Sequence, residues 1–182
     1  MNSPSENRIR LSVIVGMVLL AAAFRVLPHP SNFSPVAAMA LFGGVHFANR
    51  RLAFAVPLVA MFLSDLILGL HSMMPIIYGC FAMIVVLGIR VRRKPTVFRV
   101  AGSALAGSVG FFLVTNFAVW ALSSMYPKTA AGLSSCYVAA IPFFWRTAAG
   151  DLFYVATLFG SFRLAEWKIP ALRETSTQPA FT

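Results

Sequence analysis

The chain has 182 residues, of which 59% are hydrophobic and 11% are charged, and its mean hydropathy is +0.80. This composition is too apolar for a soluble globular domain and predicts an integral membrane protein. A net charge of +10 would favour nucleic acid binding in a soluble protein. Here the basic residues gather at the ends of apolar runs, where they orient membrane helices, so we expect no nucleic acid partner.

Six apolar segments follow one another and predict an all-α fold, an integral membrane bundle of six transmembrane helices. We interpret residues 1–182 as a single transmembrane domain, with about 9–167 embedded in the membrane and with 1–8 and 168–182 as polar tails. The predicted helices span residues 9–27, 34–47, 52–70, 74–91, 97–122 and 138–167.

The connections between these helices contain helix-breaking or basic residues. Residues 28–35 read PHPSNFSP, a run of turn-forming residues, and residues 123–137 form the longest predicted loop. Two short basic turns lie at residues 49–51 and 90–94.

Basic residues are distributed unequally between the two sides of the predicted bundle. Of the fifteen Lys and Arg residues, all except Arg25, Lys128 and Arg146 fall on the side of the two termini, which is twelve residues. The positive-inside rule therefore places both termini in the cytoplasm and predicts a multi-pass protein of the bacterial inner membrane.

Glycines recur in two of the predicted helices. Gly43 and Gly44 are adjacent in the short second helix, so we expect this helix to be tightly packed or broken there. Gly102, Gly107 and Gly110 of the fifth helix allow close packing against a neighbour.

Four charged residues fall at membrane depth, where charge is costly and indicates a binding site or an internal pair. Arg25 lies within a turn of the membrane surface, where its side chain can also snorkel. Asp65 is deeper, and the alternative to a site is an ion pair with an arginine of another helix. Arg146 and Asp151 are five residues apart, so each should find a partner elsewhere, and Arg146 can also meet an anionic group of a ligand.

Cys80 is the strongest metal ligand or nucleophile in the fourth predicted helix, about two turns from its outer end. Tyr78 and Gly79 precede it, an arrangement that lets a flat ligand approach closely. The simpler alternative is that Cys80 is a small buried hydrophobic residue. At helical spacing, the thiol shares a face with Met73, Ile77, Ile84 and Leu87.

Two further hypotheses concern other potential ligands. Cys136, in the predicted outer loop, could form a disulfide with Cys80 in an oxidising compartment. His29 stands between two prolines and is more typical of a solvated turn than of a metal site. The sequence has no HExxH, CxxC or phosphate-binding glycine loop, which argues against a structural zinc site, a hydrolase and an ATPase.

Several segments resemble the BtuM proteins, solitary substrate-binding (S) components of the energy-coupling-factor (ECF) class of vitamin importers. The likeness covers residues 24–162, and the segments that carry it read RVLPHPSNFSPVAAMALFGG, FLSDLILG, MPIIYGCF and FFWRTAAGDLFYV. The resemblance implies an ECF S-component-like fold, cobalamin (vitamin B12) as the ligand and no other cofactor. The partners that it implies are cobalamin, membrane lipid and an ECF transmembrane and ATPase module.

In that family, a cysteine of the fourth helix is the expected axial ligand of cobalt, and Cys80 fits that position. A soft thiolate suits a late cobalt centre. It would also weaken the bond to a cyanide on the opposite face, which makes Cys80 a candidate catalytic residue for cyanide removal. Candidate contacts to the corrin faces and its polar edge are Phe33, Met73, Tyr78, Phe81, Phe143 and Tyr154, with Asn32, Asn116 and Arg146.

Two alternatives remain open from the sequence. The protein could be an S component for a different vitamin in which Cys80 is only a packed residue. It could also be a membrane enzyme with a cysteine nucleophile, although no histidine is placed to act as its base.

Overall fold

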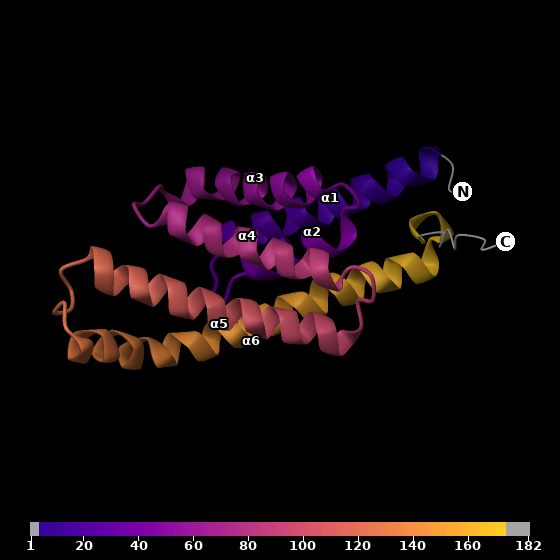
Figure 1. The fold of residues 1–182 in the computed structure, drawn as a ribbon. Coiled ribbons are helices and arrows are strands. Elements are labelled where there is room, and N and C mark those ends of the chain that lie inside the picture. The colour runs from indigo at the N-terminus through magenta and orange to yellow at the C-terminus, as the bar shows by residue number, and fades with distance from the viewer. Residues whose placement is uncertain (1–3, 174–182) are drawn as a thin grey trace.

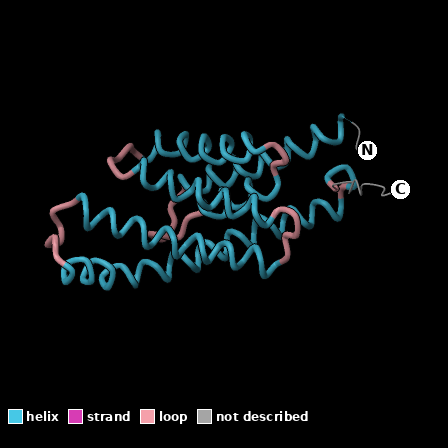
Figure 2. Tube along the Cα trace, in the orientation of Figure 1, coloured by secondary structure: helices cyan, strands magenta, loops and turns pink. Residues whose placement is uncertain are grey.

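The computed structural model describes residues 4–173, which form six α-helices and one short 3-10 helix (Figure 1). The predicted all-α fold is confirmed, and short loops join the helices (Figure 2). The elements are α1 Pro4–Val26, α2 Val36–His46, α3 Arg50–Leu68, α4 Met74–Val91, α5 Val97–Leu122, α6 Ala130–Lys168 and η1 Pro170–Leu172.

Four helices, α1, α3, α4 and α5, are long and apolar enough to cross a membrane. Helix α2 has 11 residues and so a length of about 16 Å, about half the thickness of a bilayer core. Helix α6 is continuous over 39 residues, but polar residues such as Arg146 and Asp151 interrupt its apolar sequence. The four candidate spans indicate a multi-pass membrane protein. They are fewer than the six transmembrane helices that the sequence predicts.

The connections alternate between the two ends of the bundle. In Figure 1 the start of α1 and the end of α6 lie at the same end as the α2–α3 and α4–α5 connections. The α3–α4 and α5–α6 connections lie at the opposite end. This is the arrangement that the unequal distribution of basic residues requires, and the cytoplasmic location of the basic end stays a prediction.

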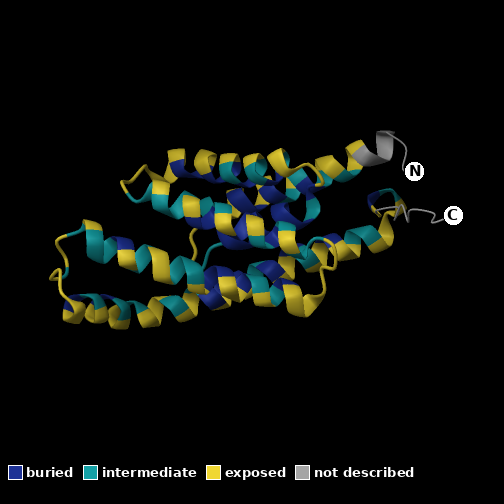
Figure 3. Cartoon of the chain, in the orientation of Figure 1, coloured by how far each residue is buried: buried dark blue, intermediate teal, exposed yellow. Residues whose placement is uncertain are grey.

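Helix α2 is the centre of the bundle and contacts each of the other five α-helices. Residues 36–45 are all buried, and Figure 3 shows them as the dark core behind the outer helices. A Cβ on Gly43 would lie 2.5 Å from Pro57 Cγ, and one on Gly88 of α4 would lie 2.5 Å from Leu41 O. The predicted tight packing at Gly43 and Gly44 is thus confirmed, and α2 is unbroken.

Arginine side chains satisfy the carbonyl groups at the end of α2, which have no partner inside the helix. Arg92 donates from Nη2 to Gly44 O at 2.8 Å and from Nη1 to Ala48 O at 2.9 Å. Arg10 donates to His46 O at 3.5 Å. Because the C-terminal end of a helix carries partial negative charge, these cations also stabilise it electrostatically.

The predicted loop at residues 123–137 is wrong, because α6 begins at Ala130. Thr129 caps the helix and accepts from the backbone N–H of Gly132 at 3.1 Å. Lys128 donates to the carbonyls of Trp120 and Ser123 and so closes the end of α5. The connection is therefore a short, internally bonded turn, and a run of small residues after Thr129 is the start of a helix.

The other helix boundaries differ less from the prediction. Helix α1 begins at Pro4, inside the predicted polar tail, and α2 begins at Val36 after a loop that ends in Pro35. Helices α4 and α5 have the bounds that the sequence predicts. Of the predicted polar tails, 1–8 and 168–182, residues 1–3 and 174–182 lie outside the described residues.

Candidate functional site

A hydrogen-bonded network around Asp65 joins α1, α3 and α4. Arg25 Nη1 lies 2.5 Å from Asp65 Oδ1, and the same nitrogen donates to Ser64 Oγ at 2.6 Å. Tyr78 donates its hydroxyl to Asp65 Oδ2 at 2.7 Å. The Asp65 side chain is 4% exposed, so both carboxylate oxygens are satisfied inside the protein. Of the two interpretations of Asp65 from the sequence, the structure shows the ion pair with an arginine of another helix, and that arginine is Arg25.

Asp151 lies in a different environment, between α6 and α5. Its Oδ2 lies 2.6 Å from Ser108 Oγ, which also lies 3.0 Å from Ala104 O of its own helix. Asp151 is 4% exposed and Ser108 is fully buried. Within residues 4–173, no Lys, Arg or His forms an ion pair with Asp151.

The two cysteines are both buried and both free. Cys80 lies on α4 and is 3% exposed. Cys136 lies on α6 rather than in a loop, and its thiol donates to Asn116 O at 3.4 Å. The disulfide considered from the sequence is therefore not formed.

An aromatic cavity of about 210 Å³ lies between α5, α6 and the α1–α2 loop. Three of its lining residues, Asn32, Asn116 and Phe143, were predicted as ligand contacts. Asn32 has a φ of 64°, a left-handed conformation that asparagine tolerates better than most residues. The remaining lining residues are Phe111, Phe112, Thr115, Ala140, Phe144 and Thr147.

One ring contact joins α4 to a residue that lines the cavity. The Phe81 ring on α4 lies 5.6 Å from the Phe111 ring on α5, measured between centroids. Cys80 immediately precedes Phe81 on α4, and the residues that line the cavity include none of α4.

The structure places the other predicted contacts apart from the cavity. Phe33 packs between Phe153 and Tyr154 of α6, with ring centroids 5.5 Å from each. Met73 precedes α4 and is half-buried. Arg146 is exposed on α6 and does not line the cavity, although it was predicted at membrane depth as a paired or ligand-binding charge.

Sequence reasoning missed most of the α5 wall and the partner of Asp151. Phe111 and Thr115 are four residues apart, as are Phe112 and Asn116, so each pair shares a face of α5. That spacing was the available signal. Ser108 carries no comparable signal, because a serine in an apolar helix usually bonds to its own backbone.

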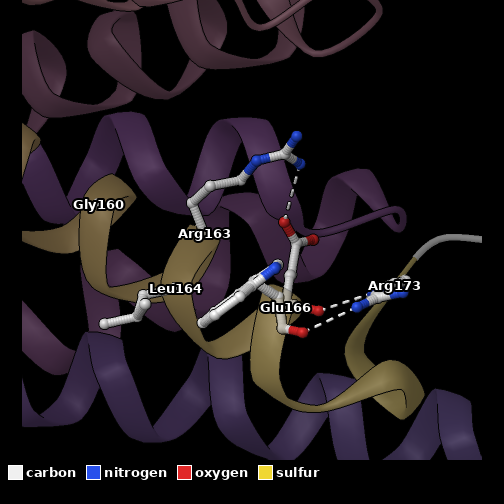
Figure 4. Close-up of a pocket in the computed structure, with 6 residues that line it drawn as sticks. Gly160, Arg163, Leu164, Glu166 and Arg173 are labelled. Carbon is white, nitrogen blue, oxygen red and sulfur yellow. Dashed lines mark hydrogen bonds and ion pairs between the residues drawn. The ribbon is translucent and has the colours of Figure 1, made fainter.

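A larger, open groove of about 760 Å³ lies at the opposite end, beside the end of α6 (Figure 4). Its polar groups are bonded to one another. Arg163 Nη1 lies 3.4 Å from Glu166 Oε2, and Arg173 donates at 2.8 Å to the carbonyls of Glu166 and Trp167. The groove is far along the bundle from Cys80 and contains none of the predicted contacts.

The family comparison covers nearly all of the described chain. Residues 5–172 match the family DUF6580, which is described as a family of unknown function. The chain belongs to DUF6580. No curated protein and no solved structure matches this DUF6580 member. The match extends from α1 to η1, so the network, the cavity and Cys80 all lie inside the region that defines the family.

Proposed function

We propose that this DUF6580 protein takes up cobalamin across the bacterial inner membrane, with the Cys80 thiolate as the axial ligand of cobalt. In this proposal all six α-helices are embedded as in an ECF S component, with both termini in the cytoplasm. Cobalamin arrives at the end that carries the α3–α4 and α5–α6 connections.

The observation that carries the proposal is the position of Cys80. It is a free, buried thiol on α4, directly before Phe81, whose ring contacts Phe111 of the cavity lining. The cavity offers aromatic walls together with the amides of Asn32 and Asn116. These are the groups that suit a broad, apolar ring with amide side chains at its edge.

The chemistry of sulfur supports this role. The thiolate is the form that binds metals, and coordination to a cation deprotonates a thiol. Thiolates favour soft or late transition metals over hard cations such as magnesium. Cys80 is buried, so a metal carried in by a ligand is a more suitable partner than a freely diffusing ion.

The cavity of about 210 Å³ is below the range of about 300–1,000 Å³ that is typical of small-molecule sites. Cobalamin therefore requires the cavity to widen, and α4 must move away from the α5–α6 pair so that Cys80 can reach the ligand. The α4–α5 contact is suited to this movement, because Gly107 and Gly110 face the side chains of Ile84 and Met83. The α2–α4 contact instead brings two backbones together and should stay fixed.

Coordination by Cys80 also predicts a change at the bound cobalt. The thiolate replaces the dimethylbenzimidazole base on the lower face, and its electron donation weakens the bond to cyanide on the upper face. Cyanide then leaves with the bonding electron pair and takes up the proton that the thiol released, which gives hydrogen cyanide and leaves the oxidation state of cobalt unchanged.

The test is the visible absorption spectrum of cyanocobalamin mixed with the purified protein, with Cys80→Ala and with Cys136→Ala. Cys136 is the matched control, because it is equally buried but lies on α6. We expect wild type and Cys136→Ala to convert the spectrum to a base-off form without cyanide, and Cys80→Ala to leave it unchanged. The same three proteins should then be compared for restoring growth of a cobalamin-dependent bacterial strain that lacks its own importer.

Two other outcomes would favour the alternatives. A spectrum that wild type leaves unchanged would indicate that Cys80 is a core residue, in a transporter for a different vitamin. A membrane enzyme with a cysteine nucleophile has less support, because His29 and His71 are exposed and the His46 ring packs against Phe42 and Phe162. No histidine within residues 4–173 is therefore placed as a base for Cys80.

A further inference from the structure

We propose that Asp151 is a proton-binding site. Its carboxyl group is held as the neutral acid while α5 and α6 are packed together, and it releases the proton when these helices separate. This site is independent of the cobalamin proposal, because it involves neither Cys80 nor the aromatic cavity.

No cation forms an ion pair with Asp151 in the part of the chain that the structure describes. Asp151 is 4% exposed, and its hydrogen-bond partner is the neutral hydroxyl of Ser108. An ionised carboxylate in such surroundings is strongly unfavourable unless a cation accompanies it. Asp65 shows how this protein compensates a buried negative charge, since it has both an arginine and a tyrosine hydroxyl.

The hydrogen bonds around Ser108 also fit a neutral acid at Asp151. Its Oγ lies within bonding distance of two acceptors, Asp151 Oδ2 at 2.6 Å and Ala104 O at 3.0 Å, but a hydroxyl has only one proton to donate. If Asp151 is the neutral acid, it donates to Ser108 Oγ, and Ser108 then donates to Ala104 O. In this series of hydrogen bonds each proton is donated once, and each of the three oxygens has a partner.

The surroundings contain no titratable group that would take over the charge. Helix α5 has none after Arg99, and on α2 the nearest is His46, which packs against Phe159 and Phe162, eight and eleven residues along α6 from Asp151. On α6 itself, Arg146 is exposed and Tyr154 packs against Phe33. The loop before α2 also lies close here, because a Cβ on Gly150 would be 3.0 Å from Phe33 Cα.

A metal ion is a poorer occupant than a proton. Hard cations take about six or more oxygen ligands, whereas this position offers a carboxylate, a hydroxyl and one backbone carbonyl. Within residues 4–173 no group of three or more His, Cys, Asp or Glu residues could hold a metal. A proton needs only the single acceptor that Ser108 provides.

The functional consequence is a link between protonation and helix packing. An ionised Asp151 needs water, and water reaches it only when the contact between α5 and α6 opens. A proton gradient across the membrane would therefore bias the packed and open arrangements differently on its two sides.

The test is infrared spectroscopy of the full-length protein in lipid at neutral pH, following the C=O stretching band of a neutral carboxylic acid. The chain has only five Asp and Glu residues, so single variants can assign the band. We expect the band in wild type and in Asp65→Asn, and its loss in Asp151→Asn, which resembles the neutral acid in shape. Ser108→Ala should keep the band but shift its frequency, because the acid loses its acceptor.

Two results would overturn the proposal. One is a wild-type spectrum without the band at neutral pH, or a band that Asp151→Asn retains. The other is disappearance of the wild-type band when potassium or choline chloride is replaced by sodium chloride, which would indicate a cation site. If Asp151→Asn does not fold, the frequency shift in Ser108→Ala decides the assignment.

Discussion

Asp65 and Asp151 are equally buried carboxyl groups, at 3% and 4% exposed, yet their surroundings differ. Asp65 receives Arg25 from α1 and the hydroxyl of Tyr78 from α4, so three helices meet at one ion pair. Within residues 4–173, the side chain that Asp151 contacts by a hydrogen bond is the neutral Ser108 of α5. The first site stabilises a charge, whereas the second favours its absence.

A buried aspartate can therefore stabilise the packing of helices or exchange a proton, depending on its partners. A buried ion pair with further hydrogen bonds has no alternative state of similar free energy, because losing either partner leaves an uncompensated charge. A neutral acid bonded to a hydroxyl can ionise as soon as water enters. We therefore expect the α1–α3–α4 junction to be rigid and the α5–α6 contact to respond to pH.

The largest expected effect is that of Asp65→Asn. Removing the carboxylate leaves the half-buried Arg25 without its counter-ion, which should lower the free energy of unfolding by up to about 3–5 kcal/mol. Asp151→Asn is the matched control and should change it much less. The measurement is unfolding in bicelles. Equal losses in the two variants would remove the distinction between the sites.

The double variant Arg25→Gln with Asp65→Asn sharpens this prediction. With both charges gone, part of the stability lost in Asp65→Asn should return, because no orphaned charge remains. If the double variant is instead as unstable as the sum of the two single variants, the ion pair is not what holds α1 to α3.

Tyr78→Phe should have the next largest effect. The change removes a hydrogen bond to a charged acceptor, which is worth about 1.5–3 kcal/mol, and leaves the ring in place. Tyr137→Phe is a suitable control, since that hydroxyl donates to Leu113 O in the backbone of α5. A loss in the control as large as that in Tyr78→Phe would count against a special role for Asp65.

The pH dependence of stability should separate the two carboxyl groups. In the unfolded chain an exposed aspartate ionises above about pH 4. In the folded protein, we propose, Asp151 stays protonated above this pH. The folded state then binds one more proton, so stability should fall by about 1.4 kcal/mol per pH unit as pH rises towards neutral. Asp151→Asn should abolish this contribution, and an unchanged slope would contradict the proposed proton.

Ser108→Ala should have the smallest effect. Hydrogen bonds between membrane helices contribute on average about 0.6 kcal/mol, because the unfolded state in lipid also finds partners. We expect a loss of that order, measured by the same unfolding assay. A loss comparable to that of Asp65→Asn would show that Ser108 holds a charged carboxylate after all.

The helical pattern was predictable because it depends on local features. The apolar runs of α4 and α5 are bounded by prolines and basic residues, and their ends were predicted to the residue. The start of α6 was not, because the capping by Thr129 is followed by small residues that also suit a loop. The pairing of Asp65 with an arginine was foreseen in kind, but Arg25 could not be selected from the sequence.

The sequence by itself determined that the chain is helical and apolar, and which termini and connections form its basic end. These properties depend on composition and on residues near one another in the chain. Only the tertiary structure decided that the short α2 is central, that Arg25 meets Asp65 and that Asp151 meets Ser108. Those contacts join residues 40 and 43 positions apart. They depend on how helices are packed side by side, which no local pattern in the chain specifies.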